Sequence, residues 1–516
     1  MRSNAPSSTV SEMHSVGTKF IEKSRYLSEG WNGYSFLPFR FDRFDEDRYI
    51  LTNDAGEFLL IASDDFQQFI NRRLSPENTV YSDLKSKFFL SDGTSSAHAR
   101  ILASKLKTKK SFLDGFTKLH MFVPTLRCNQ SCGYCQVSRV NADVAGFDMT
   151  EEIARKAVDI MLTVPAPSIT MEFQGGEPLI RFDLVRDMIE YAIERNASRK
   201  HISFIICTNL TLLTDEHLEF FKKCQVSIST SLDGPATIHD VNRPLTGQSA
   251  YVAVLRNIRR ARDALGKGAV SVLMTTTKRS LAHWKEIIDE YVRLELGAIF
   301  IRDLNPYGFA AKSKISLGYP VQEFVDFYKK ALDYIIELNL RGYGVPEAYA
   351  STLLRKIMTP YPTGFVDLQS PTGIGFAAVV YNHNGKVYAS DESRMLGEMG
   401  DDTFCLGSVL TDSYADLFYG ETMQMVAAAG CNEALPGCSD CAYQPYCGAD
   451  PVRHYTTQGD LFGHRPTSQF CEKNMGIIRH LLRLVADGGP DIQRVLWSWL
   501  AHEHHENLRL PSPQWP

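Results

Sequence analysis

Three cysteines in a short loop constrain this chain more than any other feature of its sequence. Cys128, Cys132 and Cys135 follow the apolar run His120–Thr125 at the spacing C-x3-C-x2-C. Three thiolates hold three irons of a 4Fe–4S cluster and leave the fourth iron open to a small molecule. A zinc knuckle, which normally needs four closed ligands, and a set of buried free thiols are the alternatives. The loop predicts a cluster that binds a cofactor at its open iron.

Strand-like runs alternate with helical patterns from residue 120 to residue 304. Strict alternation predicts a parallel sheet with right-handed crossovers. Six such units fit a partial (β/α)6 barrel, with its chemistry at the carboxyl ends of the strands. The expected strands are His120–Thr125, Ser168–Phe173, Ile202–Thr208, Val226–Leu232, Val270–Thr277 and Ala298–Leu304.

Candidate binding residues follow several of these strands. The second strand ends in Gly175-Gly176-Glu177-Pro178. Two glycines let a backbone approach a ligand closely, and a proline suits the first turn of the next helix. The third, fourth and sixth strands end near Thr208-Asn209, Ser231-Leu232-Asp233 and Arg302-Asp303.

These segments together resemble the radical S-adenosylmethionine (SAM) enzymes. The resemblance implies that SAM chelates the open iron and that one electron cleaves it to a 5′-deoxyadenosyl radical. It also implies contacts with SAM or substrate for Tyr134, Gly175, Gly176, Glu177, Pro178, Thr208, Asn209, Ser231, Asp233 and Arg302. A turn-forming role for Asp233 and an ion pair between Arg302 and Asp303 are the alternatives.

A second cysteine set lies closer to the C-terminus. Cys438, Cys441 and Cys447 are spaced C-x2-C-x5-C, and Cys471 follows, after a hairpin predicted at Phe376–Asn382 and Lys386–Ala389. Four cysteines can close a 4Fe–4S cluster, although C-x2-C plus two more also suits zinc. The arrangement resembles the SPASM extension of radical SAM enzymes, which implies one auxiliary 4Fe–4S cluster here.

A full SPASM extension holds two auxiliary clusters, and this chain departs from that pattern. Ser390 and Pro451 stand where the resemblance expects ligands of the first cluster. Cys405 and Cys431 could substitute as ligands, although a buried free thiol is the favoured interpretation of Cys405. Carboxylates near the emptied site, Asp391 and Asp450, are candidate general bases, although each could equally bond to neighbouring backbone.

Residues 31–115 form a separate unit. A hairpin is predicted at Tyr49–Thr52 and Glu57–Ile61, followed by a helix capped by Ser63-Asp64-Asp65 and by helical spacing from Tyr81 to Leu90. This order resembles the winged-helix element that captures the leader of a precursor peptide by strand addition. A plain helical cap on the barrel is the alternative.

Composition excludes several classes of function. A net charge of −5 gives no reason to bind nucleic acid or an anionic membrane, and no apolar run is long enough to span a bilayer. Clustered cysteines indicate metal ligation in a reducing compartment, which predicts a cytoplasmic protein.

The expected organisation is a disordered tail (1–30), the recognition unit (31–115), the barrel (116–310), a helical linker (311–365), a SPASM-like domain (366–475) and C-terminal helices (476–516).

The phrases YASDESRML, CSDCAYQPYCGADPV and FIRDLNPYGFA are similar to maturases of the His-Xaa-Ser peptide system (HxsB-like). The resemblance implies an oxidoreductase that installs a carbon–carbon, cyclophane-type crosslink in a ribosomally made precursor peptide. It further implies a flavodoxin or ferredoxin as electron donor and leaves room for a second maturase as partner. Formylglycine formation in sulfatases, thioether formation and non-catalytic leader binding are the rival functions.

Overall fold

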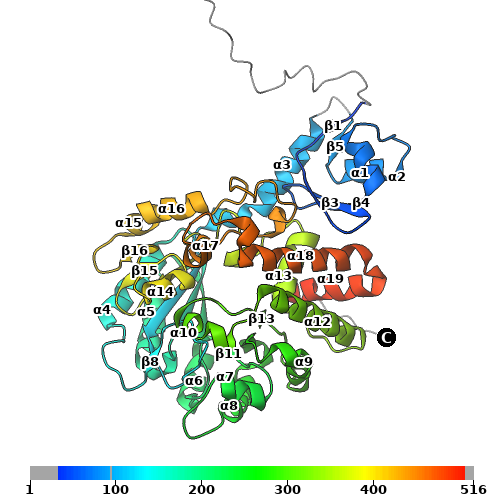
Figure 1. Cartoon of the computed structure of the whole chain (residues 1–516). Helices are drawn as coiled ribbons and strands as arrows, with labels where there is room; N and C mark the ends of the chain where they lie inside the picture. The colour runs from blue at the N-terminus through cyan, green and yellow to red at the C-terminus, as the bar shows by residue number, and fades with distance from the viewer. Residues whose placement is uncertain (1–32, 93–95, 506–516) are drawn as a thin grey trace, which may run out of the picture.

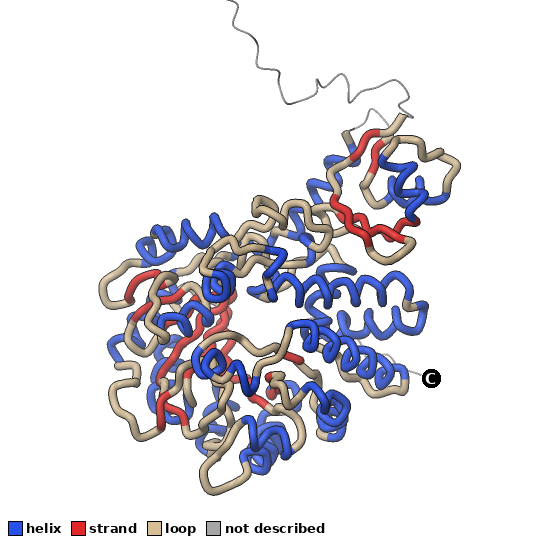
Figure 2. The backbone as a smooth tube through the Cα atoms, viewed as in Figure 1, coloured by secondary structure: helices blue, strands red, loops and turns tan. Residues whose placement is uncertain are grey.

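A computed structural model of the chain describes residues 33–92 and 96–505 (Figure 1). The disordered tail expected over residues 1–30 lies outside that range. A small N-terminal unit stands at one end of a larger body, and the strands of the large sheet gather within the body (Figure 2). No helix in the described part of the chain is both long enough and apolar enough to cross a membrane.

The body is organised around a nine-stranded sheet of order β13-β12-β11-β10-β9-β6-β14-β15-β16. Its first six strands are parallel, as the alternation predicts. They are β6 (Leu119–Thr125), β9 (Ser168–Gly175), β10 (His201–Cys207), β11 (Val226–Ser231), β12 (Val270–Thr275) and β13 (Ile301–Arg302). A short parallel pair, β7 (Arg127–Cys128) and β8 (Val140–Asn141), lies beside it.

Amphipathic helices connect the parallel strands. In α4, Thr150 caps the helix by accepting the amide of Ile153, and Ala154, Ala157 and Met161 turn inward. In α6, Thr214 and His217 form a reciprocal capping box. The connecting helices are α4 (Glu151–Thr163), α5 (Phe182–Arg195), α6 (Asp215–Cys224), α7 (Ala236–Asn242), α8 (Ala250–Leu265) and α9 (Trp284–Arg293).

The hairpin predicted before the second cysteine set forms, but it continues the barrel sheet. β14 (Ala378–Tyr381) pairs in parallel with β6, and β15 (Lys386–Tyr388) and β16 (Cys405–Ser408) extend the sheet by antiparallel pairing. All four residues of β14 are buried, so this strand needs cover on both faces. The sheet therefore runs without interruption across the boundary expected at residue 366.

The expected linker is also part of the body. α12 (Val321–Leu340) and α13 (Ala348–Met358) pack with α18 (Gln469–Asp487) and α19 (Gly489–His505) in the same core as the barrel. The indole of Trp499 is 1% exposed and donates to Asn339 Oδ1 at 3.2 Å. The remaining helices are α10 (Gly308–Lys312), α11 (Lys314–Leu317), α14 (Asp391–Gly397), α15 (Tyr414–Tyr419), α16 (Glu421–Ala429) and α17 (Pro451–Gln458).

The N-terminal unit has its own hydrophobic core. The unit contains an antiparallel sheet of order β2-β3-β4, and three helices follow this sheet in the chain. A separate short pair is formed by β1, which precedes the sheet, and β5, which follows the second helix. The elements are β1 (Ser35–Phe36), β2 (Arg40–Arg43), β3 (Arg48–Thr52), β4 (Phe58–Ala62), α1 (Ser63–Ile70), α2 (Thr79–Ser86), β5 (Leu90–Ser91) and α3 (Ala97–Lys109).

Two local predictions in this unit were wrong. Ser63 is the first residue of α1 rather than its cap, because β4 runs directly into the helix and the Ser63 hydroxyl donates to Asp47 O at 2.9 Å. α2 ends at Ser86 instead of continuing to Leu90. Phe88 adopts a left-handed backbone (φ +61), which breaks the helix and lets Leu90 pair with β1.

The N-terminal sheet docks directly on the loop that carries the second cysteine set. Arg40 Nε donates to Ser439 O at 2.5 Å, and Thr52 Oγ1 donates to Ala442 O at 2.7 Å. The hydroxyl of Tyr446 donates to Gly56 O at 3.0 Å in a buried position. These bonds join residues almost 400 positions apart in the chain.

We expect Tyr446→Phe to loosen this contact, because it leaves the buried Gly56 carbonyl without its donor at a cost of about 1–3 kcal/mol. Hydrogen exchange should then quicken about tenfold at the amides of β3 and β4. Tyr419→Phe removes a hydroxyl from a side chain that is 66% exposed and is the matched control. Equal exchange in both variants would contradict a structural role for this bond.

Candidate active site

A cavity of about 490 Å³ follows the inner face of the parallel strands. Alternate residues of the strands line it: Leu119 and Met121 from β6, Glu172 and Gln174 from β9, Ser229 and Ser231 from β11, and Leu273 and Thr275 from β12. Residues 364–367 and the start of α14 complete the wall. The cavity therefore extends along the strands and is not confined to their carboxyl ends, where the chemistry was expected.

The three cysteines of the first loop, Cys128, Cys132 and Cys135, all line this cavity as free thiols. Burial raises the pKa of Cys128 and of Cys132 to about 12, so both thiols are neutral without metal. Metal ligation requires thiolates, so assembly of a cluster here would release protons. Three thiols on a shared cavity fit a 4Fe–4S cluster with one iron left open.

Gly175 and Gly176 hold the chain against the cysteine loop. A side chain at Gly176 would place its Cβ 2.3 Å from Arg127 O, and one at Gly175 would lie 2.4 Å from Thr125 O. Gly175 also adopts φ +135, which disfavours any other residue. The glycines line the cavity as predicted, but their closest constraint is the backbone that leads into Cys128 rather than a ligand.

Glu177 braces the neighbouring strand end from a fully buried position outside the cavity wall. Its carboxylate accepts from Leu179 N (3.0 Å), Thr208 Oγ1 (2.6 Å) and Asn209 N (2.8 Å). Burial raises the pKa of Glu177 to about 7. Pro178, also buried, begins the turn that follows. Thr208 and Asn209 line the cavity, and Asn209 Nδ2 donates to Asn129 Oδ1 at 2.9 Å within the cysteine loop.

Asp233 is likewise buried behind the wall. It accepts from Tyr134 OH (2.6 Å), Arg243 Nε (3.2 Å) and the amide of Thr275 (3.2 Å). Burial would raise the pKa of Asp233, but the charges of Arg243 and His239 outweigh it and the pKa lies below its ordinary value. Asp233 therefore positions Tyr134, which lines the cavity, as does Ser231.

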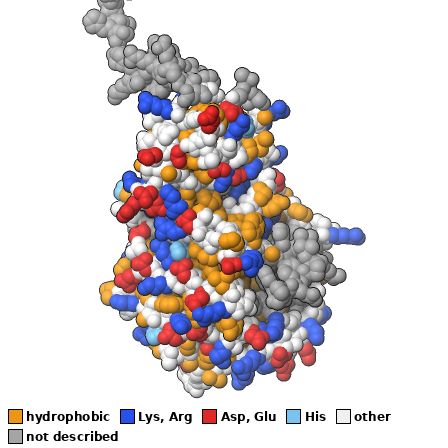
Figure 3. All heavy atoms as spheres, turned by 90° about the vertical axis from the view of Figure 1, so that its right-hand side faces the viewer, with side chains coloured by type: hydrophobic (Ala, Val, Ile, Leu, Met, Phe, Trp, Pro, Cys, Tyr) orange, Lys and Arg blue, Asp and Glu red, His pale blue; other side chains and the backbone are white. Residues whose placement is uncertain are grey.

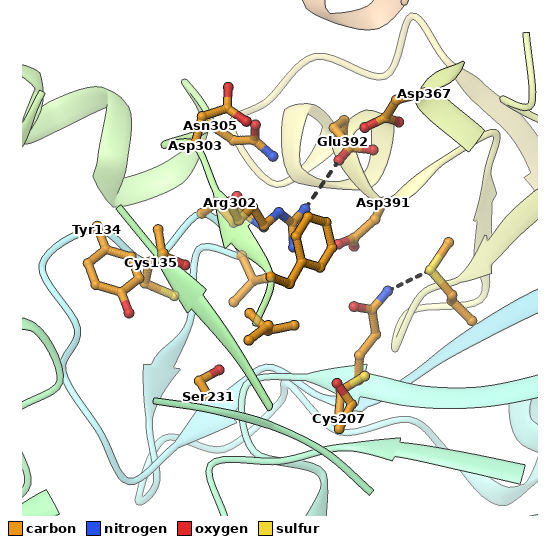
Figure 4. A pocket seen from close by; sticks show the side chains of 18 of the residues that line it. Tyr134, Cys135, Cys207, Ser231, Arg302, Asp303, Asn305, Asp367, Asp391 and Glu392 are labelled. Carbon is orange, nitrogen blue, oxygen red and sulfur yellow. Dashed lines mark hydrogen bonds and ion pairs between the residues drawn. The ribbon is translucent and has the colours of Figure 1, made fainter. Parts of the chain in front are cut away.

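A charged network forms another part of the wall. In Figure 4, Tyr134 and Cys135 lie on one side of Arg302, and Asp391, Glu392 and Asp367 lie on the other. The Arg302 guanidinium lies 3.9 Å from Glu392. Asp303 does not pair with Arg302, because it is held by Arg453 (3.0 Å) and Lys473 (2.9 Å).

The two predicted bases are both engaged. Asp391 lines the cavity, but its Oδ1 accepts from Arg394 Nη2 (2.9 Å) and Nε (3.1 Å). Asp450 lies outside the cavity lining and caps α17 by accepting the amide of Arg453 at 2.9 Å. Glu392 and Asp367, which were not chosen as the predicted bases, also line the cavity. The signal for Glu392 was its place beside Asp391 in the segment that replaces a cluster ligand.

The second cysteine set is a candidate to hold a metal group. Burial raises the pKa of Cys441 to about 11 and that of Cys447 to about 12, and charge repulsion from others of the four cysteines adds to both shifts. Asn474 Nδ2 contacts Cys447 Sγ at 3.7 Å, and Lys356 Nζ donates to Cys447 O at 2.9 Å. Among the described residues, no three His, Cys, Asp or Glu side chains are preformed around a single ion. Four thiols at Cys438, Cys441, Cys447 and Cys471 suit either iron–sulfur or zinc.

A short hydrogen-bonded path joins the cavity to this second set. Tyr349 lines the cavity, and its hydroxyl donates to Asn474 Oδ1 at 2.8 Å. Asn474 in turn contacts Cys447. The two cysteine sets, 300 residues apart in the chain, are thereby linked through the wall of one cavity.

The resemblance to radical SAM enzymes implies SAM binding, and we expect Glu177→Gln to weaken that binding about tenfold. The carboxylate faces three donors, and the amide of glutamine would set an N–H group against one of them. Anaerobic calorimetric titration with SAM measures the change. Glu216→Gln, on the exposed face of α6, is the control. An unchanged affinity in Glu177→Gln would contradict the bracing role.

Comparisons with known proteins agree with this geometry. The model of the radical SAM superfamily matches residues 122–291. A cysteine-type anaerobic sulfatase-maturating enzyme from Clostridium novyi is 22% identical over 371 residues, which cover 70% of this chain and 95% of that enzyme. An uncharacterised protein from Archaeoglobus fulgidus is 26% identical over 357 residues, which cover 68% of this chain and 78% of that protein.

Solved structures resemble the fold at lower identity. Native anSMEcpe with bound AdoMet superposes with a TM-score of 0.60 at 18% identity, covering 73% of this chain and 99% of that one. The same protein with bound AdoMet and the Kp18Cys peptide gives a TM-score of 0.59. The matched residues include the loop that brings Cys128, Cys132 and Cys135 to the cavity wall. Residues 122–291 of this chain are therefore a radical SAM domain.

Proposed function

We propose that this protein is a peptide maturase that installs a carbon–carbon, cyclophane-type crosslink in a ribosomally made precursor peptide. The observation that carries the proposal is the single cavity shared by the three-cysteine loop and the buried carboxylates. A crosslink between a side-chain carbon and an aromatic ring needs a radical generator and a proton acceptor within reach of one substrate. The cavity has candidates for both on its wall.

The cofactors would supply the radical and redox chemistry. With a 4Fe–4S cluster on Cys128, Cys132 and Cys135, bound SAM would supply the 5′-deoxyadenosyl radical that takes a hydrogen atom from a peptide Cβ. A cluster on Cys438, Cys441, Cys447 and Cys471 would supply an electron acceptor. The peptide then loses two hydrogen atoms in total, one as an atom and one as an electron and a proton, while one C–C bond forms.

The chain's own residues bind and orient the substrate. Arg302 and Lys473 bring positive charge to the cavity wall, and Ser231, Thr208 and Asn209 offer hydroxyl and amide groups. The aromatic rings of Phe300, Phe365 and Tyr349 also line the cavity and suit an aromatic side chain of the peptide. These groups fit a peptide that carries both polar and aromatic side chains.

The N-terminal unit is our candidate for binding the leader of the precursor. β2 is an edge strand of the small sheet, and Phe41 on it is 50% exposed. An exposed edge can pair with an extended peptide, and a neighbouring aromatic surface adds contact area. About a quarter of this chain has no counterpart in anSMEcpe, although nearly all of that protein is matched. The unmatched share of this chain leaves room for an additional recognition unit.

The remaining partners follow from the chemistry. A flavodoxin or ferredoxin would supply the electron that reduces the cluster, and a second maturase could act on the same precursor. All eleven cysteines are free thiols, which suits a reducing cytoplasm. On the face of the molecule in Figure 3, acidic and basic side chains are interspersed, so that face offers no extended basic surface for nucleic acid.

The second candidate function is formylglycine formation in a sulfatase. The similarity to anaerobic sulfatase-maturating enzymes favours it. Thioether formation would need cysteine in the peptide core, and a purely leader-binding protein would have no use for three free cysteines on a cavity.

Mass spectrometry of the product separates these functions. We expect the reconstituted enzyme, SAM and a precursor peptide encoded near its gene to give a product lighter by two hydrogen atoms. Tandem mass spectrometry should give no backbone fragments from between the two joined residues. The product should not react with a hydrazide. A product that forms a hydrazone carries an aldehyde and would favour the formylglycine function instead.

A further inference from the structure

The charged wall of the cavity contains two carboxylates without a hydrogen-bond donor. Within the described residues, neither Glu392 nor Asp367 accepts a hydrogen bond through its side chain, whereas Asp303, Asp391 and Asp450 each accept at least one. Glu392 lies on the first turn of α14, and its side chain is 16% exposed. The exposed part of the Glu392 side chain faces the cavity, which Glu392 lines together with the cysteine loop.

Asp391 is less suited to take up a proton, although it neighbours Glu392. Its carboxylate is held by Arg394, which is completely buried, so transfer of a proton to Asp391 would leave the Arg394 charge buried and without its partner. Asp450 is occupied as a helix cap behind the wall. The Arg302 guanidinium lies 3.9 Å from Glu392, beyond direct hydrogen-bond distance.

We propose that Glu392 accepts the proton that the substrate loses in the crosslinking reaction. This inference rests on the function proposed above. When the peptide carbon radical has joined the aromatic ring, the ring would regain its aromaticity by losing one electron and one proton. A cluster held by Cys438, Cys441, Cys447 and Cys471 would accept the electron, and the Glu392 carboxylate would accept the proton from the newly bonded ring carbon. The C–H bond breaks, its electron pair returns to the ring, and Glu392 becomes a neutral acid.

The surroundings of Glu392 favour the protonated product of that step. The titratable and charged groups that face it are Arg302 from β13, Asp367, Asp391 on its own helix, Asp450 from α17 and the hydroxyl of Tyr307. Burial raises the pKa of Glu392 to about 8, and the negative charges of Asp367, Asp391 and Asp450 add to this. Asp367 makes the largest contribution among these three negative charges. A base whose conjugate acid has a pKa near the working pH transfers protons efficiently.

Glu392→Gln tests the assignment because it preserves size and removes the basic oxygen. With the reconstituted full-length enzyme and a precursor peptide, we expect crosslinked product to fall about 100-fold or more. Release of 5′-deoxyadenosine should continue, since hydrogen abstraction precedes the proton transfer. Glu392→Asp, which keeps a carboxylate, should restore part of the product.

Glu398→Gln is the matched control, because Glu398 follows the same helix, its side chain is 15% exposed, and it does not line the cavity. It should leave both products unchanged. Crosslinking by Glu392→Gln at the wild-type rate would overturn the proposal, and so would a parallel loss of crosslink and 5′-deoxyadenosine. If the wild type forms an aldehyde instead of a crosslink, the proposed function fails, but the same comparison on the aldehyde still decides the role of Glu392.

A second readout does not need the loaded enzyme. The infrared carbonyl band of a protonated carboxylic acid can be followed in the metal-free protein from acidic to alkaline pH. The difference between wild type and Glu392→Gln should contain one band that disappears as the pH rises through about 8. Absence of such a band would overturn the assignment even if the variant failed to take up iron.

Discussion

The parallel pairing of β14 with β6 is the contact on which the rest of the site depends. β6 leads into the three-cysteine loop, and the hairpin that begins with β14 leads into α14 and its carboxylates. Because both strands belong to one sheet, the two segments form walls of one cavity although more than 250 residues separate them. His120 and Tyr381 support the pairing from the core, with His120 Nδ1 3.1 Å from the tyrosine hydroxyl. Burial lowers the pKa of His120 to about 3, so the imidazole stays neutral and this core remains uncharged.

Charge compensation explains how so many ionisable groups share that cavity wall. An isolated charge in a protein interior is costly, and here Asp303 is balanced by Arg453 and Lys473, and Asp391 by Arg394. Among the described residues, no donor bonds to the side chain of Glu392 or Asp367, and burial raises the pKa of both. The carboxylates of the wall therefore fall into two groups, one that stabilises the fold and one that is available for proton transfer. The carboxylates that accept hydrogen bonds from buried cations hold α14, α17 and α18 in place, and the two that accept none can exchange protons.

Local signals made much of this protein predictable. The strand runs and the turn at Asn384-Gly385 are determined by residues close in sequence, and the structure has the predicted strands within a few residues. The cysteine spacing identified loops that fold onto the cavity and onto the N-terminal sheet. Of the predicted binding residues, Tyr134, Gly175, Gly176, Thr208, Asn209, Ser231 and Arg302 line the cavity, whereas Glu177, Pro178 and Asp233 lie behind it.

What escaped prediction depends on long-range contacts. The continuation of the sheet through β14 needs the partner strand β6, which lies far away in the sequence. The choice between Asp391 and Glu392 is decided by Arg394, whose burial cannot be inferred from the charged segment itself. The role of Gly176 is set by the carbonyl of Arg127. Each requires knowledge of which segments meet.

Iron and sulfide content tests the central claim most directly. After anaerobic reconstitution, we expect about eight irons per chain in the wild type and about four in a variant with alanine at Cys128, Cys132 and Cys135, counting about four per cluster. Only the wild type should cleave SAM. About twelve irons would contradict the replacement of the first auxiliary cluster by carboxylates. About four irons with one zinc in the wild type would make the second cysteine set a structural zinc site. The electron that the substrate loses during crosslinking would then need another acceptor.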